Sequence, residues 1–166
     1  MFARATRPIG PDERSEAIER DLADLGARLL VEVVDAIAAG TAHPEPQDHS
    51  RSTYAHRLSR EEGLIDWSLP AIDIHNRVRG LSPWPHAHTY LDGQRLIVTA
   101  TQVAADRTDE SPGTIVGVLP DRLLVATGEG GQIAIREVQP EGRRAMAVRD
   151  YLAGHPIAPG ARLEGR

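Results

Sequence analysis

The chain has 166 residues, of which 40% are hydrophobic, and a formal net charge of −5 at pH 7, a length that suits one domain or a small domain with an added segment. It has no cysteine, which excludes disulfide scaffolds, thiolate metal sites and cysteine nucleophiles. Because no apolar run reaches the ~20 residues of a membrane helix and the first ten residues lack a signal-peptide segment, we expect a cytoplasmic protein without membrane contact.

An amphipathic pattern begins at Ser15 and ends at Gly40. Apolar residues recur every three or four positions, which predicts one stripe of an α-helix over residues 15–39. Ser15 is a suitable N-cap and Gly40 a suitable stop. The helix has no partner of its own, so it either packs on the rest of the chain or is the remnant of a larger domain. Its stripe consists of Ile18, Leu22, Leu25, Leu29, Val33 and Ile37.

Residues 41–52 predict a linker, because they contain two prolines and no aliphatic residue larger than Ala. A second helix is expected to begin near Ser68 and Pro70 and to end at Gly80. Trp84, which stands between two prolines, is expected to pack this helix against the remainder of the domain.

After Pro85 the pattern changes to short strands in hairpin order. Asp92-Gly93 between two apolar runs is a strong hairpin signal. We predict five strands and a short closing helix over 145–152, an α+β fold whose second domain, residues 53–166, is an OB-like antiparallel β-barrel. The predicted strands lie at 88–91, 95–103, 114–119, 122–127 and 132–138.

Two short motifs contain residue types that can carry chemistry. His86 and His88 beside His75 have a spacing that permits a metal site, but no carboxylate completes it, so a solvated strand start is the favoured interpretation. The glycine-rich segment 128–131 lies between two strands, where it predicts a turn with positive φ and not a phosphate-binding loop. No nucleophile elbow is present, so the residues themselves indicate no catalytic group and no bound metal.

All 19 basic residues are arginines, and charge is unevenly distributed. Residues 1–50 carry a net charge of −5, and residues 51–166 carry none. A guanidinium group binds phosphate bidentately, so arginines gathered on one face would suit a nucleic-acid backbone. Scattered surface arginines are an equally good interpretation. The candidate RNA contacts are Arg143, Arg144, Arg136, Arg95, Arg122, Arg77 and Arg79.

Taken in order, the motifs resemble the C-terminal half of methionyl-tRNA formyltransferase. Upstream, Pro8–Glu13 and the following apolar helix resemble the end of that family's catalytic domain. The resemblance covers nearly the whole chain. The motifs that carry it are Thr53–Ala55, Leu58–Glu62, Ile65–Ser68, Ile74–Leu81, Pro83–Pro85, Asp92-Gly93, Pro112–Ile115, Val125–Gly128, Gln139-Pro140, Gly142–Met146 and Pro159-Gly160.

This resemblance implies a role in translation initiation, in which the family transfers a formyl group from 10-formyltetrahydrofolate to initiator methionyl-tRNA. It implies that residues 1–40 end a Rossmann-like catalytic domain and that 53–166 contact the tRNA. The family's catalytic segment does not occur here, so we expect no catalytic residue and no cofactor bound by this chain. Arg143 and Arg144 stand where the family usually has at least one lysine.

Three hypotheses follow. The first is a C-terminal portion of methionyl-tRNA formyltransferase, inactive alone, whose catalytic domain is missing or separately encoded; its exposed helix stripe would then favour self-association. The second is a stand-alone RNA-binding or interaction module. The third is a fragment of a related folate-dependent amino-sugar formyltransferase, which the Asp-Trp-Ser and Pro-Trp-Pro motifs disfavour.

Overall fold

A computed structural model describes residues 1–166, which divide into two compact units. The N-terminal unit is Met1–Arg57 and the C-terminal unit is Leu58–Arg166. The segment 41–52 lies within the N-terminal unit, mostly as irregular chain with one 3-10 turn at His49–Arg51. None of the helices combines the length and apolar composition that crossing a bilayer requires.

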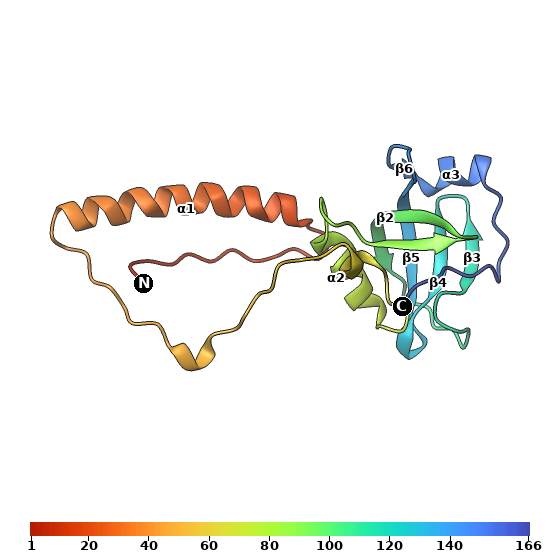
Figure 1. Ribbon diagram of the computed structural model, residues 1–166, viewed down its shortest axis with the longest axis horizontal. Helices are drawn as coiled ribbons and strands as arrows, with labels where there is room; N and C mark the ends of the chain where they lie inside the picture. Colours follow the sequence, from red (N-terminus) through yellow and green to blue (C-terminus); the bar gives the residue numbers. More distant parts are fainter. The chain divides into compact units, whose positions relative to one another are not determined.

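The N-terminal unit contains one helix, α1 (Ser15–Ala38, Figure 1), of 24 residues. The capping prediction was wrong, because Arg14 is the N-cap and makes no side-chain cap. Arg7 instead ties the chain before the helix to its first turns, through a bidentate hydrogen bond to Glu13 (2.8 and 2.7 Å) and a contact with Asp21. At the other end Gly40, at φ 70°, turns the chain out of the helix.

No side chain of α1 is buried. Along the predicted stripe Leu22 is 46% exposed and Ile37 52%, whereas Leu25, Leu29 and Val33 are half-buried. An amphipathic helix normally covers such a stripe against another element. The stripe is therefore only partly covered in this structure, where Phe2 and Ala3 line a shallow pocket with Leu29 and Val33.

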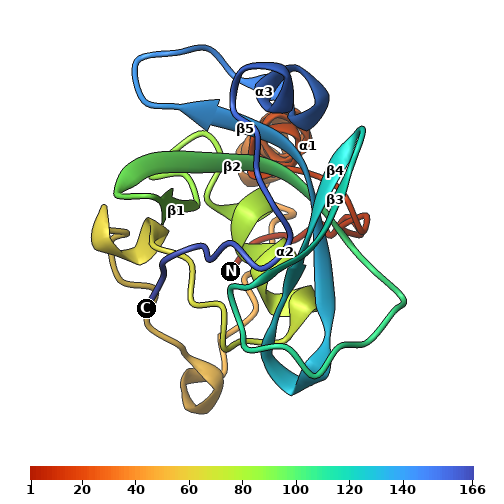
Figure 2. The same cartoon turned by 90° about the vertical axis from the view of Figure 1, so that its right-hand side faces the viewer.

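The C-terminal unit is built on a six-stranded antiparallel sheet (Figure 2). The strands run in the order β1-β2-β5-β4-β3, and β6 pairs with β5. Asp92 and Gly93, at φ 51° and 75°, form the tight turn between β1 and β2, as the sequence predicts. The strand bounds are β1 His88–Leu91, β2 Gln94–Val103, β3 Ile115–Leu119, β4 Arg122–Ala126, β5 Gln132–Pro140 and β6 Met146–Ala147.

The predicted fold class, a long N-terminal helix followed by a five-stranded OB-like β-barrel, was wrong. The structure has three α-helices, of which α1 spans only 24 residues, and a sheet of six strands. The sixth strand, β6, has only two residues, too few for an alternating pattern to reveal it in the sequence. The end strands β1 and β3 do not pair with each other.

The C-terminal segment lies between those two end strands (Figure 2). Glu164 bridges to Tyr90 of β1, and Arg162 bridges to Thr114 just before β3. Between them the side chain of Leu163 is 1% exposed, and its N–H donates to Gly113 O at 2.8 Å. The segment therefore satisfies backbone groups that two unpaired sheet edges would leave open.

Two short helices complete the unit, α2 (Ala71–Gly80) and α3 (Val148–Gly154). The buried face of α2 packs against β2, through Ile74 and Val78 among others. Trp67, 3% exposed, anchors the chain before α2 in the core, and its Nε1 donates to Thr89 Oγ1 at 3.3 Å. Figure 1 shows α2 and α3 within this unit.

Candidate functional site

The structure divides the seven predicted RNA-contacting arginines into groups with different surroundings. Arg122 and Arg136 lie on the neighbouring strands β4 and β5 and both pair with Asp121, each at 3.2 Å. One carboxylate thus offsets part of the charge of both guanidinium groups. These two arginines are the least suited of the seven to bind a phosphate, because a phosphate would compete with Asp121.

Arg77 and Arg79 lie on α2 and are half-buried. Arg77 Nη2 donates to the carbonyl of Glu62 at 2.8 Å, which ties the helix to the 3-10 turn Glu61–Gly63. Arg79 Nε donates to Asn76 Oδ1 at 2.9 Å. Both guanidinium groups have structural partners within the unit.

Arg143 and Arg144 are exposed in the loop between β5 and β6. The loop backbone is held at two points, since Arg143 N donates to Pro140 O at 3.0 Å and Gln139 Nε2 donates to Arg143 O at 2.9 Å. Arg143 also lines a surface pocket of about 640 Å³ with Arg95 of β2. The structure thus brings Arg95 and Arg143 together at one pocket. Arg144 follows Arg143 in the chain but does not line that pocket.

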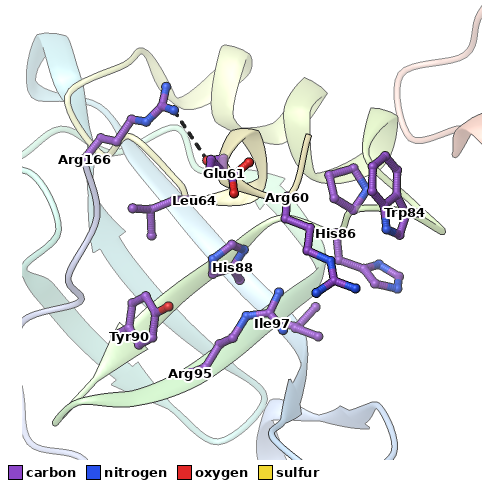
Figure 3. Close-up of a pocket in the computed structure, with 11 residues that line it drawn as sticks. Arg60, Glu61, Leu64, Trp84, His86, His88, Tyr90, Arg95, Ile97 and Arg166 are labelled. Atoms are coloured by element: carbon purple, nitrogen blue, oxygen red, sulfur yellow. Dashed lines mark hydrogen bonds between the residues drawn. The ribbon is translucent and has the colours of Figure 1, made fainter. Parts of the chain in front are cut away.

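A second pocket, of about 670 Å³, was not anticipated from the sequence (Figure 3). Arg95 lines this pocket too, so it contributes to both. Figure 3 shows Arg60 and Arg95 directing their guanidinium groups into the same opening, with Trp84 at the rim. The remaining lining residues are Glu61, Leu64, Pro85, His86, His88, Tyr90, Ile97 and Arg166.

The expectation that Trp84 packs α2 against the sheet was wrong. Its side chain is 48% exposed at the pocket rim, and the buried indole of the unit is that of Trp67. A tryptophan between prolines gives no periodic signal of which way it faces, so only the tertiary structure decides its role. The sequence shows that a tryptophan and several arginines are present, but it does not show that they lie next to one another.

His88 forms the inner wall of this pocket and is 7% exposed. Its ring meets Tyr90 edge-on, with centroids 5.9 Å apart and an interplanar angle of 79°. Burial, and then the nearby Arg95 charge, lower the pKa of His88 below its ordinary 6.5. The imidazole is therefore neutral at pH 7.

The structure also describes the two short motifs of the sequence. No group of three His, Cys, Asp or Glu side chains is arranged to hold a metal ion. The glycine-rich segment forms a 3-10 turn, Gly128–Gly130, in which Glu129 and Gly130 have φ of 57° and 68°. This segment is therefore a turn with positive φ, as predicted.

Comparison with known proteins gives the family. Residues 57–156 match the family model described as the formyl transferase C-terminal domain. The chain is 40% identical over 166 residues to methionyl-tRNA formyltransferase of Roseiflexus castenholzii, covering 99% of this chain and 52% of that protein. It is 42% identical over 163 residues to the Trichlorobacter lovleyi protein of the same name, covering 98% and 51%. The chain thus spans about half the length of these curated relatives.

Comparison with solved structures supports the fold of this chain and, at less than 25% identity, nothing beyond the fold. HypX from Aquifex aeolicus in complex with tetrahydrofolic acid has a TM-score of 0.64 at 14% identity, covering 99% of this chain and 31% of that one. An N-formyltransferase from Helicobacter canadensis, with folinic acid and dTDP-3-aminofucose, has a TM-score of 0.58 at 13% identity, covering 78% and 47%. The resemblance inferred from the sequence is confirmed, and this chain belongs to the formyltransferase family, as a C-terminal portion of its methionyl-tRNA formyltransferase members.

Proposed function

We propose that this chain is the tRNA-contacting portion of an enzyme that formylates initiator methionyl-tRNA in the cytoplasm. The observation that carries the proposal is the 40% identity to a methionyl-tRNA formyltransferase over 99% of the chain. Residues 1–40 then end the catalytic domain, 41–52 link it onward, and 53–166 contact tRNA. The formyl donor, 10-formyltetrahydrofolate, binds to a catalytic domain outside these residues.

Within the C-terminal unit, Arg95, Arg143 and Arg144 are the preferred phosphate contacts. Arg143 and Arg144 are exposed, and none of the three pairs with a carboxylate, unlike Arg122 and Arg136. A guanidinium group without a protein counter-ion loses no ion pair when it binds a phosphate. Glu141 and Asp150 also line the pocket that Arg95 and Arg143 share, so the assignment rests on guanidinium groups without a direct ion pair and not on an excess of positive charge.

Salt dependence of tRNA binding tests the contact. Each phosphate contact contributes about 0.7–0.9 to the slope of log Kobs against log salt concentration, so Arg143→Gln/Arg144→Gln should reduce that slope by about 1.4–1.8. Arg20→Gln/Arg28→Gln removes the same charge from α1 and serves as the control. A slope unchanged by the Arg143/Arg144 double variant would overturn the assignment.

Catalysis is tested separately. With 10-formyltetrahydrofolate and charged initiator tRNA, the purified chain is expected to produce no formylmethionyl-tRNA. Turnover by the chain alone would contradict the placement of the catalytic groups outside it. The amino-sugar alternative rests on a structure with 13% identity, which shows the fold alone, so tRNA is the preferred substrate class.

The exposed face of α1 belongs to the same proposal. As the end of a catalytic domain, the helix would cover its stripe against that domain. In the isolated chain the stripe is only partly covered, and self-association through it is expected. Sedimentation over a range of protein concentrations measures this, and Leu22→Gln/Ile37→Gln, at the two most exposed positions of the stripe, should restore a monomer.

A further inference from the structure

The pocket lined by Arg60, Arg95, Trp84 and His88 combines two kinds of chemistry in one concave place (Figure 3). Three arginines and one glutamate line it, so positive charge exceeds negative. The glutamate, Glu61, accepts hydrogen bonds from its own backbone and from Ser59, which lower its pKa. The charge of Arg60 lowers it further, so Glu61 offsets part of the positive charge of the pocket, and an excess of arginine remains.

The two arginines that face the opening form no direct ion pair, although Arg60 is close enough to Glu61 to help lower the pKa of that carboxyl. Neither Arg60 nor Arg95 forms an ion pair with a carboxylate, whereas Arg122 and Arg136 share Asp121. Arg60 stands just before the 3-10 turn Glu61–Gly63 and Arg95 on β2, so distant parts of the sequence converge here. Two unpaired guanidinium groups directed into one opening suit an anion with several oxygens, such as a phosphate.

The rest of the pocket suits an uncharged, flat group. Trp84 offers a half-exposed indole at the rim. His88 is a buried, neutral imidazole on the inner wall, able to hydrogen-bond without adding charge. An aromatic face beside phosphate-binding cations is the combination with which proteins hold single nucleic-acid strands.

We propose that this pocket binds one unpaired nucleotide of an RNA strand, with its phosphate at Arg60 and Arg95 and its base stacked on Trp84. The inference rests on the proposed function, to which it adds a defined subsite. The nucleotide must be unpaired, because the bases inside a duplex are already stacked on both faces. A volume of about 670 Å³ accommodates a nucleotide and not a double helix.

Tryptophan fluorescence measures binding at this pocket directly. The chain has two tryptophans, and Trp67 is 3% exposed, so a change on binding reports Trp84. A single-stranded tetranucleotide RNA is expected to quench the emission, whereas inorganic phosphate and a blunt RNA duplex without loops are expected to leave it unchanged. A free nucleoside monophosphate should quench more weakly than the tetranucleotide, because it lacks the neighbouring phosphates.

Variants separate the two halves of the pocket. Arg60→Gln/Arg95→Gln should lower the affinity for the tetranucleotide at least about tenfold, because at least one charge-assisted hydrogen bond to the phosphate is lost. Trp84→Phe should retain binding measured by anisotropy of a labelled strand, and Trp84→Ser should lose it. The control is Arg20→Gln/Arg28→Gln, and thermal melting confirms that each variant is folded.

The outcomes distinguish the subsite from the broader proposal. If tRNA binds but Trp84 emission does not change, or if folded Arg60→Gln/Arg95→Gln binds the tetranucleotide as wild type does, the subsite is wrong and the tRNA proposal stands. If the tetranucleotide quenches Trp84 but tRNA does not bind, the tRNA proposal is wrong and the subsite stands. Quenching by inorganic phosphate to the same extent would reduce the pocket to an anion site and overturn the inference.

Discussion

Tyr90 and Glu164 exchange two backbone hydrogen bonds, from Tyr90 N at 3.2 Å and from Glu164 N at 2.8 Å. Thr89 Oγ1 adds a third bond to the same residue, donating to Glu164 O at 2.6 Å. This contact attaches the last residues of the chain to the first strand of the sheet. The C-terminal segment is therefore part of the folded unit.

Loss of the Leu163 side chain should destabilise the C-terminal unit. It is 1% exposed between the two end strands, and deleting a buried leucine side chain to Ala costs about 2–5 kcal/mol. Leu163→Ala should lower the free energy of unfolding by that amount in urea titration. Leu119→Ala, at a position 38% exposed, is the control and should change it by less than about 1 kcal/mol. Equal effects would contradict the structural role of the C-terminal segment.

Gly128 should not tolerate a side chain. A Cβ there would lie 1.8 Å from Ser68 O, and Gly128 N already donates to the carbonyls of Trp67 and Leu69 at 3.0 and 2.9 Å. Gly128→Ala should destabilise the unit by about 1–3 kcal/mol, the usual range for overpacking. Gly154→Ala is the control, because a Cβ there meets nothing within 4 Å. Thermal melting measures both, and equal midpoints would show that the close approach is absent.

Removing the shared carboxylate should strengthen RNA binding at the Arg122 and Arg136 pair. Both arginines are within 3.2 Å of Asp121, so Asp121→Asn frees two guanidinium groups. The variant should bind single-stranded RNA more tightly and with a steeper salt dependence than wild type. Asp109→Asn changes the net charge equally at an exposed site. If Asp109→Asn has the same effect, net charge alone explains the result.

His88 should make stability fall in mild acid. Burial lowers its pKa in the folded state, so between the ordinary value of 6.5 and the lower folded value the unfolded chain binds more protons. The free energy of unfolding contributed by this group therefore rises with pH across that window and is lost as pH falls. Urea titrations at pH 7.5 and 5.5 should show a smaller difference in His88→Gln than in wild type. His49→Gln, in the exposed 3-10 turn, should retain the wild-type difference.

Local patterns were reliable for the strands and turns. Asp92-Gly93 and the segment 128–131 adopt the positive φ that their composition predicts. The two-residue β6 and the paired C-terminal segment carry no periodic pattern, because their order depends on partners distant in sequence. The six-stranded sheet could not be derived for that reason.

The candidate site shows the same division. The sequence shows seven candidate arginines, but it does not show that their surroundings differ. Two of them form ion pairs with Asp121, and Arg77 and Arg79 donate hydrogen bonds within the unit. The sequence does not predict a site at Arg60 and Trp84, since nothing in a linear pattern shows that they converge with Arg95. A motif of aromatic and basic residues is informative only once the chain is folded.

From its amino-acid sequence alone this protein could be assigned to its family and to its local elements, because motif order and residue periodicity are properties of neighbours along the chain. Only the tertiary structure decided which arginines form ion pairs, which tryptophan is exposed, and how the end strands are covered. Those properties depend on side chains that meet across long sequence separations. Contacts of that kind set burial, ion pairing and the shape of a pocket, and so the function of the surface.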